Sequence, residues 1–345
     1  MIEAKVACRA TRNSEYCGIL DHEVMNMNIW KNGILGVVVG DALGCPVQFE
    51  SREEVARHPV TGMRGYGTFN LPAGSWTDDS SLTLALLESI KRNGGIDYTD
   101  IMDNFVKWLD DGEFTPYGYA YDIGRGTMNA IRKYKRDHKP HEAGSTTENN
   151  NGNGSLMIIM PAVLYCIERA LPTDDAIDII HRVGGLTHGH IRAKIACGLY
   201  YFMAAAILKS DGLLNDRLQA GIDTGFAFYE RYLADHENLE YYDRLHDLTS
   251  FANLSEDAIR STGSVVDSLE AAVWSLATTT DFETALLKAV NLGYDTDTAG
   301  AIAGGLAGLF YQTIPEAWTE VLQRREWIEN LIEETEHALN MFQSD

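Results

Sequence analysis

The sequence has few basic residues and no paired cysteines, and each shortage excludes some classes of function. Lys and Arg number 28 against 50 Asp and Glu in 345 residues, giving a formal net charge of -22. A basic surface is what nucleic acids and anionic membranes attract, so neither is an expected partner. The five cysteines are scattered without a CxxC pair, which indicates reduced thiols in the cytoplasm rather than disulfides or a zinc site.

Long apolar runs and alternating strand patterns are also scarce. Residues 1–28 have no apolar run after their charged start, so no signal peptide is expected. The longest small-apolar run, 299–310, is shorter than the roughly 20 residues that span a bilayer, so we expect no transmembrane segment. We interpret residues 1–28, which are polar and weakly patterned, as an N-terminal arm ahead of a single domain at 29–345.

Helical periodicity covers most of the remaining chain, and 45% hydrophobic residues can build a sizeable core. We predict an all-α fold, one compact domain of ten or more helices. Beyond three helical patterns between residues 29 and 114, the expected helices are 119–135, 156–170, 173–184, 190–209, 214–233, 264–279, 281–291, 297–311 and 316–342. The aperiodic segment 138–157 ends in Asn, Gly and Ser before an apolar helix. It is either a surface loop or a phosphate site built from free backbone N–H groups.

Two predicted helix starts concentrate carboxylates and hydroxyls. Their residues are Thr77, Asp78 and Asp79 near one end of the domain and Asp295, Asp297 and Thr298 near the other. Either start alone is explained by helix capping, which stabilises by about 0.5–2 kcal/mol. Adjacent carboxylates repel each other, however, and a divalent cation relieves that repulsion. Because the donors are all hard oxygens, the two starts together favour Mg²⁺, Mn²⁺ or Ca²⁺ over zinc, with enough carboxylates for two ions.

Glycine stripes suggest how the two acidic starts meet. The stripes are Gly36, Gly40 and Gly44 in the first helix and Gly300, Gly304 and Gly308 in the late one. Each glycine inside a helix costs about 1 kcal/mol relative to alanine, so stripes of this kind indicate close backbone packing. We expect these two helices to pack deeply, with Asp41 near the centre and both acidic starts opening into one cleft. The alternative is that the stripes only ease core packing.

Six motifs in order resemble the ADP-ribosylglycohydrolases over about residues 30–312. They are GVVVGDALGCPVQFE, WTDDSSLTLAL, YDIGRGTMNAI, NGNGSLM, LTHGH and GYDTDTAGAIAGGLAG. The resemblance implies an all-α fold with a binuclear Mg²⁺ or Mn²⁺ cleft. It also implies hydrolysis of the N-glycosidic bond between ADP-ribose and a protein arginine. An ADP-ribosylated protein is then the expected substrate.

The resemblance also assigns roles to individual residues. The metal ligands would be Thr77, Asp78, Asp79, Asp295, Asp297 and Thr298, the substrate-binding residues Asn153, Gly154, Ser155, His188 and Tyr294, and the catalytic residues Asp122 and Asp79. Either Asp122 or Asp79 would take the proton from water, with Glu50 as an outside alternative. Asp122 would otherwise grip the arginine guanidinium or cap a helix.

Three positions depart from the family pattern. Gln48 stands where members often carry Glu, which leaves the identity of the general base open. Ile158 replaces a frequent Arg and would alter packing around the 138–157 loop. Tyr294 replaces a small residue and would stack on a ligand or narrow the cleft.

Three rival functions remain at the level of sequence. The first is immunity to an ADP-ribosyltransferase toxin by binding, with residues 1–28 blocking the toxin and little catalysis. The second is a helical nucleotide phosphohydrolase that uses the His-Asp pair in LHDL, 245–248. The third is a non-catalytic structural descendant of the family, which loss of metal ligands would mark.

Overall fold

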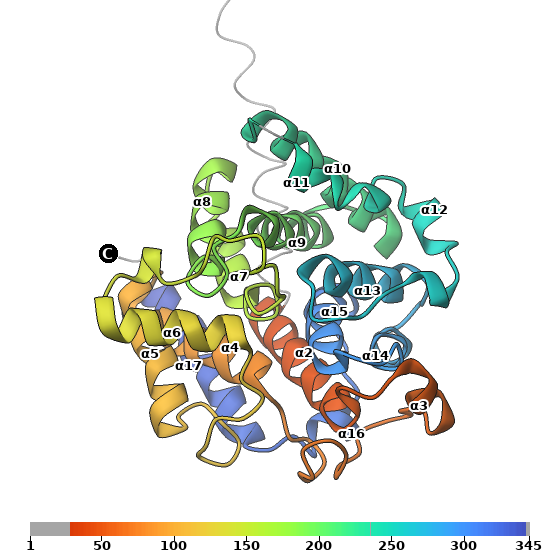
Figure 1. The fold of residues 1–345 in the computed structure, drawn as a ribbon, viewed down its shortest axis with the longest axis horizontal. Coiled ribbons are helices and arrows are strands. Elements are labelled where there is room, and N and C mark those ends of the chain that lie inside the picture. The colour runs from red at the N-terminus through yellow and green to blue at the C-terminus, as the bar shows by residue number, and fades with distance from the viewer. Residues whose placement is uncertain (1–27, 235, 343–345) are drawn as a thin grey trace, which may run out of the picture.

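Two glycine-rich helices, α2 (Ile29–Gly44) and α15 (Thr296–Tyr311), lie side by side and antiparallel at the centre of the molecule (Figure 1). A Cβ on Gly36 would overlap the carbonyl oxygen of Gly304, and one on Gly40 would overlap that of Gly300. The two backbones therefore touch, which only glycine permits at these positions. This confirms the close packing that the glycine stripes predict.

The computed structural model describes residues 28–234 and 236–342, and within these ranges helices alternate with loops and no β-strand forms. The only strand-like pairings there are isolated bridges between Ser145 and His188 and between Gly152 and Ser264. The all-α prediction is confirmed. The predicted N-terminal arm lies outside the described residues except for Asn28, whose side chain accepts a hydrogen bond from the first turn of α2.

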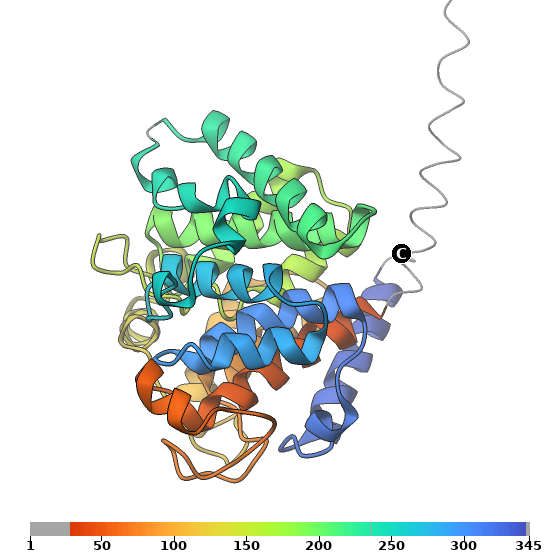
Figure 2. The same cartoon turned by 90° about the vertical axis from the view of Figure 1, so that its right-hand side faces the viewer.

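The other helices surround the central pair. They are α3 (Arg52–Arg57), α4 (Asp78–Asn93), α5 (Tyr98–Asp111), α6 (Arg125–Asp137), α7 (Met160–Glu168), α8 (Thr173–Gly184), α9 (Ile191–Lys209), α10 (Leu214–Tyr232), α11 (Glu237–Glu240), α12 (Leu248–Ala252), α13 (Val265–Ala277), α14 (Phe282–Val290), α16 (Glu316–Thr319) and α17 (Arg325–Met341). Short 3-10 turns occur at Cys45–Val47, Pro140–Glu142, Asp243–Leu245 and Glu256–Ala258. Figure 2 shows α10 and α9 stacked above α13, with α15 and α2 beneath.

The helix α9 is long and apolar enough to cross a membrane, and it is the only described helix that is. Its most apolar stretch is 78% buried inside the protein, where α9 packs against α8, α10, α13 and α15. Burial by neighbouring helices accounts for its composition, because a helix that is hydrophobic all round also suits the core of a globular fold.

Three predicted helix boundaries are wrong. The helix expected at 119–135 begins only at Arg125, because Asp122 adopts a left-handed backbone conformation with φ 53°. The helix expected at 156–170 begins at Met160, after a turn in which the Leu156 amide bonds to the Asn153 carbonyl. The single helix expected at 316–342 is two helices, since the chain reverses at Arg324 with φ 54°.

Candidate active site

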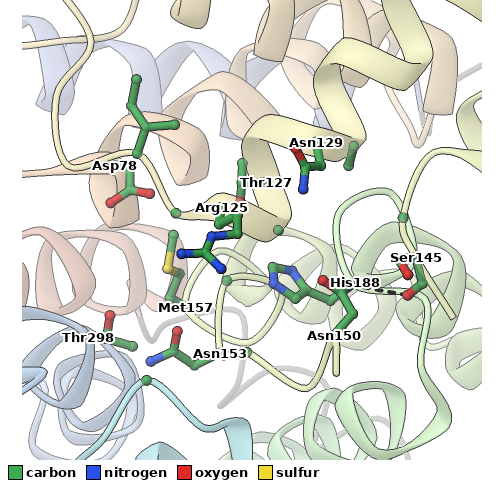
Figure 3. A pocket seen from close by; sticks show the side chains of 18 of the residues that line it. Asp78, Arg125, Thr127, Asn129, Ser145, Asn150, Asn153, Met157, His188 and Thr298 are labelled. Atoms are coloured by element: carbon green, nitrogen blue, oxygen red, sulfur yellow. Dashed lines mark hydrogen bonds between the residues drawn. The ribbon is translucent and has the colours of Figure 1, made fainter. Parts of the chain in front are cut away.

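A cleft of about 1240 Å³ opens where α4, α6, α15 and the segment 138–157 converge (Figure 3). Eight of the site residues predicted from the sequence line it, together with Gln48: Asp78, Asp79, Asp122, Asn153, Gly154, His188, Asp295 and Thr298. Thr77, Asp297 and Ser155 are buried and are not part of the lining, and neither is Tyr294, which is 45% exposed. Both acidic starts reach the same cleft, as the glycine stripes predict.

The two acidic helix starts meet directly at the base of the cleft. Thr77 Oγ1 lies 3.2 Å from Asp297 Oδ2 and 3.4 Å from Asp79 Oδ2. Thr298 Oγ1 donates to Asp79 Oδ2 at 3.4 Å. Residues more than 200 positions apart in the chain thus share one oxygen cluster.

Helix capping does not account for these residues. The side chains of Thr77 and Asp295, which stand at the N-caps of α4 and α15, make no capping hydrogen bond. Asp41 of α2 serves α4 instead: its carboxylate accepts from Thr77 N at 3.0 Å, Ser80 N at 2.9 Å and Ser80 Oγ at 2.6 Å. Asp41 accepts hydrogen bonds from backbone N–H groups at the start of α4, so the carboxylates of Asp78 and Asp79 are not needed to cap this helix.

The electrostatics of the cluster favour a bound cation. Burial raises the pKa of Asp78, Asp79 and Asp297 well above the ordinary range, and the charges of neighbouring aspartates raise it further. Asp79 Oδ1 is buried without a hydrogen-bond partner, which is costly for a carboxylate oxygen. A cation would offset both penalties, and carboxylate and hydroxyl oxygens are the donors that Mg²⁺ and Mn²⁺ prefer.

The donor chemistry therefore fits a metal, although the side chains do not enclose an ion position. Among the described residues, no three or more His, Cys, Asp and Glu side chains form a group that could hold one ion. Two threonine hydroxyls, of Thr77 and Thr298, stand among the carboxylates. The binuclear centre expected from the sequence therefore stays a prediction.

Gln48 interacts with two carboxyl groups of the same cluster, those of Asp122 and Asp295. Burial raises the pKa of Asp122 and of Asp295, while hydrogen bonds to the Gln48 side chain act on both to lower it. Gln48 is itself 4% exposed, and its Oε1 has no partner. A neutral amide at this position adds no further negative charge to an already crowded site. Asn153 also serves the cluster, since its Nδ2 donates to Asp295 Oδ2 at 2.6 Å.

The opposite part of the cleft is built from glycines around a histidine. A Cβ on Gly126 or Gly154 would press into the His188 ring, at 2.5 Å from Nε2 and 2.7 Å from Cε1 respectively. Burial lowers the pKa of His188 to about 4, so the ring is neutral at physiological pH. Figure 3 shows Arg125 extending from the start of α6 between Asp78 and His188. Arg125 was not predicted from the sequence, although its place between two glycines at a helix start was a usable signal.

The remaining residues singled out from the sequence have contacts that belong to the packing of the fold. Ser155 is buried against the Cys197 thiol, and Ile158 is fully buried in the core. Tyr294 has φ 63°, and its amide and carbonyl bond to the backbones of Glu50 and Phe49.

The His-Asp pair of LHDL does not form a site. His246 packs on the Phe226 ring at 3.7 Å, and Asp247 caps α12. Neither residue lines the cleft, so the motif on which the phosphohydrolase alternative depends is not part of the candidate site.

Comparisons with known proteins agree with this geometry. The sequence model of the ADP-ribosylglycohydrolase family matches residues 30–344. ADP-ribosylarginine hydrolase Tri1 of Serratia proteamaculans is 30% identical over 309 residues, covering 88% of this chain and 78% of that protein. Its namesake in Pseudomonas putida is 32% identical over 307 residues, covering 88% and 76%. ADP-ribosyl-[dinitrogen reductase] glycohydrolase of Rhodospirillum rubrum is 28% identical over 295 residues, covering 84% and 89%.

Solved structures share the fold as well. A chain described as "ADP-ribosylglycohydrolase-related protein complex" superposes with a TM-score of 0.72 at 30% sequence identity, covering 90% of this chain and 98% of that one. The family match spans nearly the whole described domain and includes both acidic helix starts. The chain belongs to the ADP-ribosylglycohydrolase family.

Proposed function

We propose that the protein hydrolyses the N-glycosidic bond of ADP-ribosyl-arginine on proteins and so reverses mono-ADP-ribosylation. The observation that carries the proposal is the meeting of two acidic helix starts inside one cleft, where Thr77 Oγ1 lies 3.2 Å from Asp297 Oδ2. The Serratia and Pseudomonas relatives are named ADP-ribosylarginine hydrolases, which favours arginine over serine or free ADP-ribose derivatives.

Two Mg²⁺ or Mn²⁺ ions are the cofactors that the cluster favours. The proposed ligands are Thr77, Asp78, Asp79, Asp295, Asp297 and Thr298, all hard oxygen donors at two helix starts. Bound there, the ions would orient the ribose hydroxyls and acidify a water. Asn153 orients Asp295 through the 2.6 Å hydrogen bond, and Asp41 fixes the backbone that presents Asp78 and Asp79.

Asp122 is the general base that the surroundings support best. It lies on the 112–124 loop, outside the two helix starts that supply the proposed ligands, and its carboxyl interacts with that of Asp297. Burial raises the pKa of Asp122 above its usual range, which makes it a stronger proton acceptor, and Gln48 orients it. Bond cleavage at the anomeric carbon develops positive charge, and the acidic surroundings stabilise that charge. The Arg125 guanidinium is suited to the negative phosphates of ADP-ribose.

The test is release of ADP-ribose from a protein carrying ADP-ribosyl-arginine. We expect release with Mg²⁺ or Mn²⁺, none in EDTA, and almost none for Asp297→Asn. Asp122→Asn should lower kcat by roughly 10²–10⁴-fold, the usual contribution of a general base. If Asp122 instead grips the guanidinium, KM rises and kcat changes little. Serine-linked ADP-ribose is the matched control substrate, and faster release from serine than from arginine would contradict the proposal.

We further propose that the protein gives immunity to a toxin and acts in the cytoplasm. Residues 1–28 would bind an ADP-ribosyltransferase toxin, while the cleft erases its product. Deleting residues 1–28 should leave hydrolysis intact and abolish toxin binding, and loss of hydrolysis on deletion would contradict this division of labour. A cytoplasmic location is consistent with the unpaired buried thiols of Cys45, Cys166 and Cys197.

A further inference from the structure

Six aromatic side chains from three separate loops gather beside the acidic end of the cleft. This aromatic rim consists of Phe49, Tyr66, Phe69, Tyr117, Tyr119 and Tyr121. Ring centroids are 6.3 Å apart for Phe49 and Phe69, 5.4 Å for Phe69 and Tyr121, and 5.9 Å for Tyr119 and Tyr121. Burial raises the pKa of Tyr117, and the nearby Tyr119 and Tyr66 add to that effect. The loops 58–77 and 112–124, which carry five of the six rings, lie at the lower edge of Figure 1.

The outer rings of the aromatic rim are exposed to solvent. Tyr66 is 67% exposed, Phe49 64% and Tyr119 51%. The backbones of Phe49 and Tyr66 also hold φ at 67°, a left-handed conformation that bulky residues rarely adopt. Neither burial nor backbone preference therefore explains why these positions carry large rings. Contiguous exposed aromatic surface of this kind is typical of an interaction site.

The inner rings fix the aromatic rim to the catalytic end of the cleft. Tyr121 donates its hydroxyl hydrogen to the carbonyl of Trp76, the residue before Thr77. Tyr117 Oη and Ser75 Oγ share a hydrogen bond of 2.6 Å, one residue earlier. Phe49 follows Gln48 and lines the cleft itself. The rim is therefore continuous with the carboxylate cluster and rigidly placed against it.

If the proposed function holds, the position of the aromatic rim indicates which part of the substrate would contact it. In Figure 3, Asp78 and Thr298 lie on one side of the cleft and Ser145 and Asn150 on the other. Phe49 lines the cleft next to Gln48, which interacts with Asp122 and Asp295. If the glycosidic bond is cleaved at the carboxylates, the arginine and its polypeptide leave on the side of the rim. Tyrosine rings bind extended peptide and stack on guanidinium groups, and a net charge of -22 favours a basic segment.

We propose that the aromatic rim docks the polypeptide that flanks the ADP-ribosylated arginine, with a preference for segments containing further arginines. The rim thus gives the enzyme affinity for protein substrates that the ADP-ribose group alone does not supply. This inference rests on the proposed hydrolase function.

The test compares two substrates that differ only beyond the arginine: ADP-ribosylated protein and free ADP-ribosyl-arginine. The double variant Tyr66→Ser with Tyr119→Ser removes two exposed rings that do not line the cleft. We expect kcat/KM on the protein to fall about 10-fold or more through KM, since aromatic residues are frequent hot spots of interfaces. Hydrolysis of free ADP-ribosyl-arginine should not change. Tyr66→Phe with Tyr119→Phe should restore the wild-type KM, and Tyr232→Ser, at an exposed tyrosine on α10, is the matched control.

The other outcomes overturn the inference in distinguishable ways. Equal losses on both substrates would make the rim part of the cleft, and no loss on either would remove its role in docking. A wild-type dimer that the double variant dissociates would place a second copy of this chain on the rim. If the wild type cleaves neither substrate, the proposed function fails first and the docking inference fails with it.

Discussion

At the scale of single residues, Asp41 links the packing of the core to the chemistry of the cleft. It is fully buried on α2, and its carboxylate accepts hydrogen bonds from the amides and hydroxyls of both Thr77 and Ser80. These four donors leave little capacity on the carboxylate for a metal. Asp41 is therefore a positioning residue, which presents the acidic start of α4 to the cleft.

Asp41→Asn tests that role. The amide group of Asn would face donors from Thr77 and Ser80, leaving buried donors unpaired, and each buried unpaired group costs about 1–3 kcal/mol. We expect a loss of roughly 2–4 kcal/mol in the free energy of unfolding, measured by urea denaturation, and lower hydrolysis. Ser80→Ala, which removes only one hydroxyl donor, should cost about 1 kcal/mol. An Asp41→Asn variant as stable as the wild type would contradict the assignment.

The residues of the site differ in how well sequence alone could identify them. The two groups of carboxylate and hydroxyl residues at 77–79 and 295–298 were identified from composition, because clustered carboxylates indicate a cation site without any structure. Asp122 came only from a family resemblance, since the sequence pattern placed it inside an expected helix at 119–135. The aromatic rim escaped notice because Phe69 and Tyr121 are 52 residues apart (121 − 69), and nothing local encodes their contact.

At the scale of elements, the contact between α2 and α15 sets the geometry of the cleft. Gly44 lies against the backbone of Thr296 and Asp297, so the end of α2 and the second acidic start are in direct contact. Asp41 is on the same helix, one turn earlier. Asp41 holds the start of α4, and Gly44 lies against the start of α15. The distance between α2 and α15 therefore decides whether the two acidic starts meet.

Gly40→Ala is expected to disrupt this arrangement, whereas Gly33→Ala is not. A Cβ on Gly40 would overlap the Gly300 backbone, while one on Gly33 meets side-chain ends, the nearest being those of Leu309 and Leu164 at 3.2 and 3.3 Å. Because backbone cannot yield and leucine tips can, we expect Gly40→Ala to cost about 3 kcal/mol or more and Gly33→Ala less than about 1 kcal/mol. Thermal unfolding followed by circular dichroism measures both. Similar Tm values for the two variants would contradict close packing as the cause.

Helix interiors could be predicted from the sequence, but several helix ends could not. Apolar periodicity predicted α8, α9 and α10 to within a residue or two of their observed bounds. The break between α16 and α17 is tertiary in origin, because the Gln323 amide bonds to the carbonyl of Gly74, far away in the chain. The late start of α6 has a similar cause, since Tyr119 and Tyr121 are held by the aromatic rim rather than by helical bonds.

At the scale of the whole molecule, the fold concentrates negative charge in its interior. Asp41 comes from α2, Asp79 from α4, Asp122 from a loop and Asp297 from α15, and burial raises the pKa of each carboxyl. Among the residues that the structure describes, the basic side chains lining the same cleft are Arg125, Lys133, His141 and His188. The protein as a whole carries a net charge of -22, so long-range attraction favours cations everywhere near the surface.

This concentration of charge predicts that a divalent cation stabilises the whole protein, independently of catalysis. Mg²⁺ or Mn²⁺ at one hundred times its Kd should add about 2.7 kcal/mol, seen as a rise of several degrees in Tm relative to EDTA. Asp79→Asn removes one repelling charge and one proposed ligand. In EDTA this variant should therefore unfold at or above the wild-type Tm, and added metal should raise its Tm far less. Ca²⁺ and Zn²⁺ at equal concentration serve as controls for ion preference. An equal metal-induced rise in both proteins would place the ion elsewhere, whereas a lower Tm for Asp79→Asn in EDTA would show that the carboxylate stabilises the fold without any metal.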